Sequence, residues 1–147
     1  LMRNLDINAD HFRTVTLQRT ELIEDLWEDA IETAIRVSRS DIFKRAQNAQ
    51  RSFVEIPFSL SKRKVDEKGS KRVIRGVIDL VFRESPGWVI VDYKSDRSPE
   101  SKLEFLVDLY APQLRGYSMA WADITGEPVI EKGLYFTHHN KYVVVAA

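Results

Sequence analysis

Two aspartates and a lysine stand in apolar stretches of this sequence, where their charges need a partner. Asp79 interrupts the run VIDLVF, and Asp92 and Lys94 come at the end of VIVDYK. Two carboxylates held together in a half-buried position repel and desolvate each other unless a cation compensates them. An ion pair with Lys94 would compensate part of that charge. A Mg²⁺ ion would compensate more, since it prefers one or two carboxylates together with water and phosphate oxygens.

A metal ion at these carboxylates would supply the chemistry of phosphodiester hydrolysis. It would bring a bound water closer to hydroxide and polarise a phosphoryl oxygen. Lys94 would orient or deprotonate that water, or neutralise charge that builds up on the phosphorus. The spacing D-x₁₂-D-x-K also arises by chance in many proteins. The spacing alone therefore leaves two interpretations open, a metal site and an ordinary ion pair at a strand end.

Predicted strands bring the three residues together. The stretches 52–61, 72–84 and 88–94 are rich in β-branched and aromatic residues and predict a three-stranded antiparallel meander. We expect the polar stretch 62–71 to be the connection of the first hairpin, with Gly69 near its tip, and SPG to be the turn of the second. Alternation places Asp92 and Lys94 on one face of their strand, and the short turn brings Asp79 close to Asp92.

Stretches in which apolar residues have helical spacing lie before and after this meander in the sequence. Residues 20–40 predict a helix capped by Thr20, with Glu21, Glu24 and Asp25 at the positive end of its dipole, and residues 41–51 predict a second helix. Residues 99–126 predict a further helical stretch, as one bent helix or two.

In that third stretch, Pro112 indicates a new helix start and Gly126 a stop. Strands at 129–137 and 141–147 enclose the turn HHNK. A helix between strands 88–94 and 129–137 predicts a crossover that joins parallel strands. The expected fold is α/β, a mixed sheet of about five strands with helices on its faces.

Composition narrows the possible functions. At 147 residues the chain is expected to be one domain, with a helical part over 1–51 and an α/β catalytic core over 52–147. Lysine and arginine balance aspartate and glutamate at 22 each, so net charge gives no argument for a polyanionic partner. No cysteine is present, which excludes disulfides, thiolate zinc sites and iron–sulfur clusters and favours a reducing, cytoplasmic location. No apolar run approaches the ~20 residues of a membrane span.

The motifs together resemble a known family. GVIDLVF, WVIVDYKSD and YAPQLRGY, preceded by VEIPFSL at 54–60, are similar to the PD-(D/E)XK nuclease superfamily. They resemble most closely the nuclease domain at the C-terminal end of AddA/RecB-type helicase–nucleases. The similarity covers roughly residues 41–137. The D-x-K element alone is weak, whereas the ordered set of E-P-F, G-x-x-D, D-Y-K and Q-x-x-x-Y is specific.

The resemblance implies roles for individual residues. Asp79, Asp92 and the backbone carbonyl of Tyr93 would bind the metal, and Lys94 would be the catalytic lysine. Glu55 matches an acidic position of the family, either an outer ligand or a support for Lys94.

Gln113 and Tyr117 match the Q-x-x-x-Y element, which such nucleases place beside the active site. Lying four residues apart on a helix, they share a face from which they can contact DNA phosphates or bases. The structural alternative for Tyr117 is a core residue.

The resemblance implies a Mg²⁺-dependent deoxyribonuclease, with Mn²⁺ as an alternative metal. It would be the exonuclease domain of a helicase–nuclease in double-strand-break repair and recombination. The implied partners are single-stranded DNA delivered by a helicase, an ATP-dependent helicase module in the same parent chain, and a second subunit of the complex. Two alternatives stay open: a DNA-binding module of this fold without activity, and a stand-alone restriction or CRISPR-type nuclease.

The sequence departs from the family in two respects. No G-x-x-x-x-G-K-[ST] loop is present, and helix 20–38 lacks the histidine ligand that the family carries upstream of E-P-F. His11 lies too close to Glu55 to replace it, and His138 and His139 fall in the last hairpin turn. The expected histidine would precede Leu1, so we expect this chain to be a piece of a longer protein that folds but cuts DNA poorly alone.

The basic stretch 62–72 carries six positive charges against two negative. It is interpreted as a solvated loop, with contact to a DNA backbone as the alternative.

Overall fold

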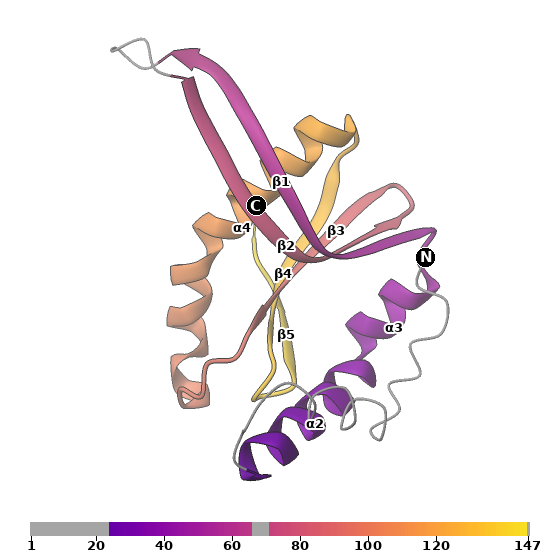
Figure 1. The fold of residues 1–147 in the computed structure, drawn as a ribbon, viewed down its shortest axis with the longest axis vertical. Helices are drawn as coiled ribbons and strands as arrows, with labels where there is room; N and C mark the ends of the chain where they lie inside the picture. The colour runs from indigo at the N-terminus through magenta and orange to yellow at the C-terminus, as the bar shows by residue number, and fades with distance from the viewer. Residues whose placement is uncertain (1–23, 66–70, 147) are drawn as a thin grey trace.

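The computed structural model describes residues 24–65 and 71–146, and the expectations for His11, Thr20, Glu21 and Gly69 lie outside these ranges. One five-stranded mixed sheet has the strand order β1-β2-β3-β4-β5 (Figure 1). The elements in chain order are α2 (Glu24–Ser38), α3 (Asp41–Asn48), β1 (Arg51–Val65), β2 (Lys71–Glu84), β3 (Gly87–Lys94), the 3₁₀ turn η1 (Glu100–Lys102), α4 (Leu103–Thr125), β4 (Val129–Phe136) and β5 (Lys141–Val144). The α/β fold expected from the sequence is confirmed.

The first three strands form the predicted antiparallel meander. β1 pairs with β2 from Arg51 opposite Arg83 to Val65 opposite Lys71. β3 pairs with β2 only as far as Leu80 opposite Val91. The hairpin of β1 and β2 therefore continues well beyond the last β2–β3 pair, and Figure 1 shows it as a long ribbon that leaves the rest of the sheet.

This extension corrects one prediction. Residues 62–65 and 71, expected in a polar connection, belong to the strands. The backbone N–H and C=O groups of β1 and β2 hydrogen-bond to each other here even though the sequence is polar. A two-stranded ribbon needs no buried face to complete these hydrogen bonds.

A single helix makes the crossover between β3 and β4, which pair in parallel with Asp92 opposite Leu134. α4 runs without a break from Leu103 to Thr125, so the expectation that Pro112 begins a new helix is wrong. Pro112 is on the exposed side of the helix, where its ring and missing N–H are accommodated within one continuous element. Gly126 ends the helix as predicted, with φ 70° and its N–H donating to Ala122 O.

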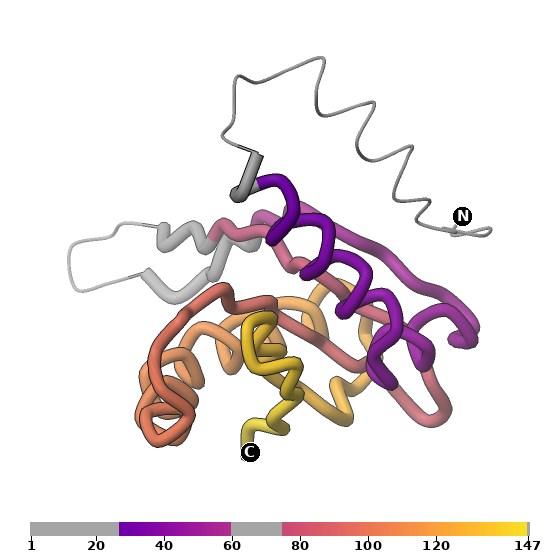
Figure 2. Tube along the Cα trace, turned by 90° about the horizontal axis from the view of Figure 1, so that it is seen from below, coloured from indigo at the N-terminus to yellow at the C-terminus, as the bar shows by residue number. Residues whose placement is uncertain are grey.

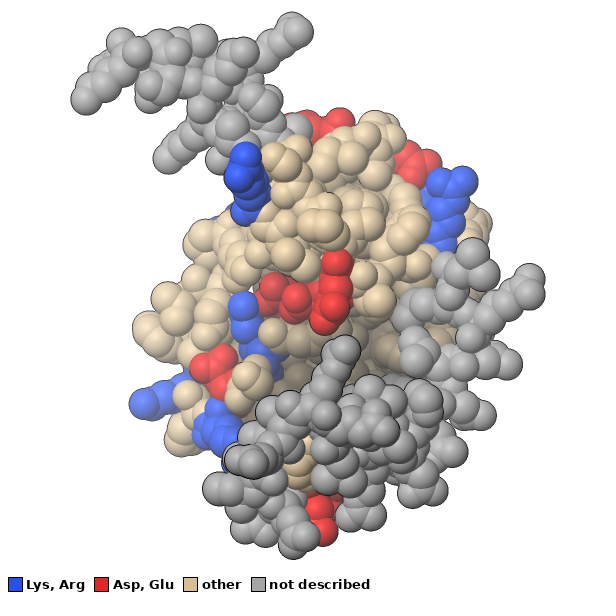
Figure 3. Space-filling view, viewed as in Figure 1, with Lys and Arg blue, Asp and Glu red and all other residues tan. Residues whose placement is uncertain are grey.

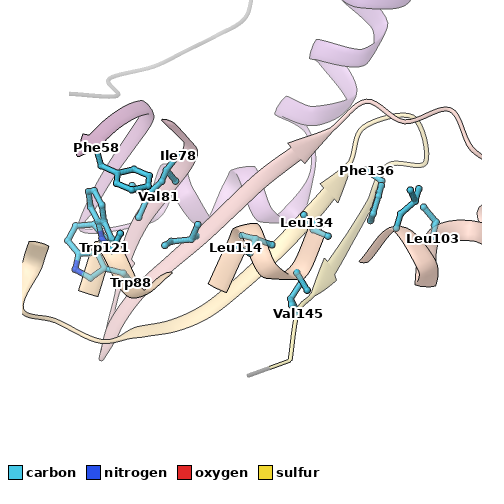
Figure 4. Packing of buried hydrophobic residues seen from close by; sticks show 14 residues of the cluster. Phe58, Ile78, Val81, Trp88, Leu103, Leu114, Trp121, Leu134, Phe136 and Val145 are labelled. Atoms are coloured by element: carbon cyan, nitrogen blue, oxygen red, sulfur yellow. The ribbon is translucent and has the colours of Figure 1, made fainter. Parts of the chain in front are cut away.

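Helices cover both faces of the sheet, and Figure 2 shows α2 and α4 on opposite sides of it. On the α4 side lies a large apolar cluster that includes Ile78, Ile90, Leu114 and Trp121, part of which is drawn in Figure 4. On the other side a smaller cluster joins Ile42 and Ala46 of α3 to β2, β3 and β4.

The helix α3 also meets its terminal hydrogen-bonding needs locally. Ser40 caps it by accepting the Phe43 N–H at 3.3 Å.

Figure 3 shows basic and acidic side chains interspersed on one face of the molecule. No helix among the described residues is long and apolar enough to cross a membrane.

Candidate functional site

The site lies where β2 and β3 separate. Beyond the pair of Leu80 and Val91 the backbone ladder stops, and a side chain takes its place. Oδ2 of Asp79 accepts the backbone N–H of Tyr93 at 2.8 Å. The residue before Tyr93 is Asp92, so this bond holds the first carboxylate beside the strand that carries the second.

The alternation of side chains between the two faces of the sheet breaks in β1 and in β2 near Asp79. Ile78 and Val81, three residues apart, both enter the cluster on the α4 side. In β1, Ile56 packs against the same cluster and Phe53 contacts Trp88 of it. Strict alternation would place residues three apart on opposite faces, so each strand carries an irregularity.

The irregularity of β1 centres on Glu55. Its φ is 50°, and the pairing passes from Val54 opposite Leu80 to Ile56 opposite Ile78, which leaves Glu55 across from Asp79. A residue other than glycine with positive φ costs about 1–3 kcal/mol, and such strain clusters at functional sites. Glu55 and Asp79 line one pocket of about 590 Å³, together with Tyr93 and with Val37 of α2. Glu55 is therefore on the Asp79 side, and the described contacts of Lys94 do not include it.

Asp92 is the buried charge of the site. Its exposed fraction is 3%, and it is the one charged residue among the buried described residues. Nζ of Lys94 lies 2.7 Å from its Oδ2, on the same face of β3, as alternation predicted. Apart from this ion pair, Oδ2 has no hydrogen-bond donor within the described part of the chain. Burial raises the pKa of Asp92 and the nearby Asp79 adds to the rise, while Lys94 opposes it.

Side chains of α4 complete the surroundings of Lys94. Its Nζ donates to Oε1 of Gln113 at 3.1 Å, and the Gln113 amide donates to the hydroxyl of Tyr117 at 2.8 Å. The ring of Tyr117 packs edge-on against Phe58 of β1, with centroids 5.3 Å apart. A Cβ at Gly76 would come within 2.8 Å of Phe58 and 2.9 Å of Tyr117, so glycine is needed for this packing. Gln113 and Tyr117 share a face, as predicted, and connect Lys94 to the base of the hairpin.

Several oxygen atoms that could bind a metal ion lie at this corner of the sheet. The N–H and C=O of one strand residue point the same way, so the Tyr93 carbonyl points toward β2, past the last backbone pair. Two carboxylates and one carbonyl suit a hard divalent cation, which takes oxygen ligands. The Asp92 carboxylate is buried and has few hydrogen-bond donors around it, so a cation of this kind would suit it. Within the described ranges no cluster of three or more His, Asp or Glu side chains is preformed for a metal, so further ligands would be water or substrate oxygens.

Sequence reasoning missed two residues of this site. The ring of Tyr110 lies against Lys94, with Nζ 4.1 Å from the ring centroid, and the Tyr110 hydroxyl donates to Oδ2 of Asp96 at 3.1 Å. The signal was present, because Tyr110 precedes Gln113 by three residues on one helix and so shares its face. The histidines of the last hairpin stay apart from the carboxylates: His138 is exposed, and Nε2 of His139 lies 2.8 Å from Ser98 O.

Comparison with known proteins gives one family match. The sequence profile described as the PD-(D/E)XK nuclease superfamily matches residues 5–144. Among curated proteins, a subunit of the "ATP-dependent helicase/nuclease" of Carboxydothermus hydrogenoformans is 35% identical over 116 residues, 75% of this chain and 10% of the relative.

Proteins of the same name from two other bacteria are also similar. The Geobacillus thermodenitrificans protein is 29% identical over 92% of this chain and 13% of the relative. The Lysinibacillus sphaericus protein is 38% identical over 69% of this chain and 8% of the relative. The chain thus spans about a tenth of the length of these relatives.

Proposed function

Because the chain belongs to the PD-(D/E)XK nuclease superfamily, we propose that it hydrolyses DNA phosphodiester bonds with the help of a divalent metal. Asp79, Asp92 and the carbonyl of Tyr93 bind the metal, which is Mg²⁺, with Mn²⁺ as a substitute. When bound, the ion activates a water and polarises the phosphoryl oxygen. The observation that supports this proposal most is the buried Asp92 carboxylate. The groups around it in the chain compensate its charge only in part.

The side chains have separate tasks in this proposal. Asp79 is held in place by the Tyr93 N–H, so it keeps its direction when the substrate enters. Lys94, between Asp92 and Gln113, directs its ammonium at the attacking water or at the charge that develops on the phosphate. Glu55, across from Asp79, acts as an outer support of the metal, reached through a water. Gln113 and Tyr117 contact the DNA strand at the base of the long hairpin.

The larger context follows from the relatives. The proteins of similar sequence are named as helicase/nuclease subunits and are about ten times longer than this chain. We propose that the chain is the nuclease domain of such a helicase/nuclease, in which it acts in DNA repair and recombination. A helicase module of the same parent chain would deliver single-stranded DNA, and a second subunit would complete the assembly.

Metal dependence is tested first, by calorimetric titration with Mn²⁺ and by cleavage of linear DNA with Mg²⁺ or with EDTA. We expect binding in the wild type and its loss in Asp79→Ala and in Asp92→Ala. Cleavage by the full-length protein that contains this chain should need the metal and leave 5′-phosphates. An exposed carboxylate of α4 gives the matched control, Asp123→Ala, which should bind and cut like the wild type. Undiminished Mn²⁺ binding in Asp79→Ala and Asp92→Ala would refute the assignment.

A further inference from the structure

Tyr110 contacts the lysine of the site without touching either carboxylate in the described contacts. Nζ of Lys94 lies 4.1 Å from the centre of the Tyr110 ring. An ammonium over an aromatic face is attracted by the negative charge of that face, and the attraction grows as the pair is removed from water. The Lys94 side chain is 15% exposed, so the contact is shielded from most of the solvent.

The ring itself is fixed from its far end. The Tyr110 hydroxyl donates to Oδ2 of Asp96 at 3.1 Å, and this acceptor raises the pKa of Tyr110. Asp96 follows Lys94 by two residues, in the segment between β3 and η1. Lys94 and Asp96 thus hold the two ends of one tyrosine, so the segment after β3 and the helix α4 are joined at the lysine.

The three contacts of the ammonium come from two elements, β3 and α4. Asp92 precedes Lys94 by two residues on β3, while Gln113 and Tyr110 lie three residues apart on α4. A lysine side chain has four rotatable bonds, so a single carboxylate leaves its head group free to turn. The Tyr110 ring restricts that freedom, since it adds a third contact to the two that the oxygens of Asp92 and Gln113 make.

We propose that Tyr110, anchored by Asp96, is a positioning residue for Lys94 that fixes the direction of its ammonium between Asp92 and Gln113. The contact stands on the geometry alone. Its consequence for catalysis rests on the proposed function, and a nuclease that depends on an oriented lysine loses rate when this orientation is lost.

Proton magnetic resonance of the metal-free protein tests the contact without any cleavage. The ring current of Tyr110 shifts the Lys94 ε-methylene protons upfield, and Lys94→Arg identifies their signal. We expect the shift to disappear in Tyr110→Leu, and to persist in reduced form in Tyr110→Phe and Asp96→Ala, which keep the ring and remove its anchor. Phe105→Leu is the matched control, because it removes a 65% exposed aromatic ring from the same helix. An unchanged shift in Tyr110→Leu would overturn the proposal.

Cleavage kinetics of the full-length protein test the consequence. Tyr110→Leu should lower kcat by about 10-fold, the usual effect of losing a supporting contact, with KM and Mn²⁺ affinity unchanged. Tyr110→Phe should recover most of the rate. Loss of the ring-current shift with an unchanged kcat would overturn the positioning role. A wild-type protein that binds no metal and cuts no DNA would instead refute the proposed function, and the resonance data would still decide the contact.

Discussion

At the scale of residues, the site is defined by one carboxylate that the protein buries at a cost. Asp92 loses hydration at 3% exposure, and its ion pair with Lys94 compensates this only in part. Burial and the neighbouring Asp79 both favour its neutral form. A residue in this state is stabilised by a second cation, so metal binding and protein stability should depend on the same group.

Stability against pH measures this cost in the metal-free protein. The pKa of Asp92 in the folded state lies above its unfolded value, so the folded state binds more protons in the interval between the two values. Stability therefore falls as pH rises through that interval and stays lower above it. Asp92→Asn should be more stable than the wild type above the interval and equal to it at pH below ~3.9, the unfolded value.

Urea unfolding in EDTA at a series of pH values makes the comparison. Asp123→Asn, which changes an exposed carboxylate, should follow the wild type at every pH. Saturating Mn²⁺ should then stabilise the wild type and leave Asp92→Asn unaffected. If Asp92→Asn were the less stable protein at neutral pH, burial would not be the dominant influence on this group.

Residue types and spacing predicted several of the contacts in the candidate site. The pairing of Asp92 with Lys94 followed from alternation along one strand, and the shared face of Gln113 and Tyr117 followed from helical periodicity. The bond from the Tyr93 N–H to Asp79 could not be predicted, because it requires two strands to part at one residue. Positive φ at Glu55 was equally hidden, since glutamate has no preference for that conformation.

At the scale of elements, α4 carries the second half of the site. It supplies Tyr110, Gln113 and Tyr117 to the face that meets Lys94 and Phe58. Helical spacing predicted this stretch as one bent helix or two, and the expectation of a new start at Pro112 was wrong. A proline inside a helix loses one hydrogen bond and crowds the carbonyl four residues before it, which favours a break. Packing along the whole length of the helix outweighs this cost.

Gln113 and Tyr117 should affect the substrate and not the metal. Gln113→Ala and Tyr117→Phe each break the bond between the amide and the hydroxyl, which is 2.8 Å long. We expect single-strand affinity or cleavage rate to fall by about 2- to 10-fold, the worth of one hydrogen bond. Fluorescence anisotropy with a labelled oligonucleotide measures the affinity, and Gln47→Ala on the exposed side of α3 is the control. A changed Mn²⁺ titration in either variant would count against this division of roles.

Gly116 is a glycine inside α4 that its own surroundings do not require. A Cβ there would meet no atom within 4 Å, so Gly116→Ala should stabilise the protein by about 0.5–1 kcal/mol through helix propensity alone. The control is Gly126→Ala at the end of the same helix, where φ is 70° and alanine is strained. That variant should be less stable than the wild type in the same thermal unfolding experiment. Equal effects of both substitutions would contradict the helix geometry described here.

At the scale of the whole molecule, the helices on the two faces of the sheet are held to it by different interactions. The α4 side is joined by the larger apolar cluster. The α3 side adds a charged network, in which Arg45 binds Glu131 at 2.8 Å and Glu84 at 2.9 Å. Both carboxylates raise the pKa of Arg45, so the guanidinium stays charged and joins α3 to β2 and β4. The candidate site thus lies in a sheet that helices hold on both faces.

The order of strands and the parallel crossover were predicted from sequence, because strand length, turn residues and one long helix leave few ways to connect five strands. The long ribbon of β1 and β2 was not predicted, since polar side chains gave no sign that the backbone pairing continues to Val65.

Cleavage of linear DNA by the full-length protein with Mg²⁺, under single-turnover conditions, tests the central claim most directly. Lys94→Ala should abolish cleavage, because its ammonium lies 2.7 Å from Asp92 and is the positive side chain in contact with the buried carboxylate. Lys44→Ala, which removes an exposed lysine from α3, should cut at the wild-type rate. Loss of cleavage in Lys94→Ala with Mn²⁺ binding retained is the predicted result, and cleavage by Lys94→Ala at the wild-type rate would contradict the account.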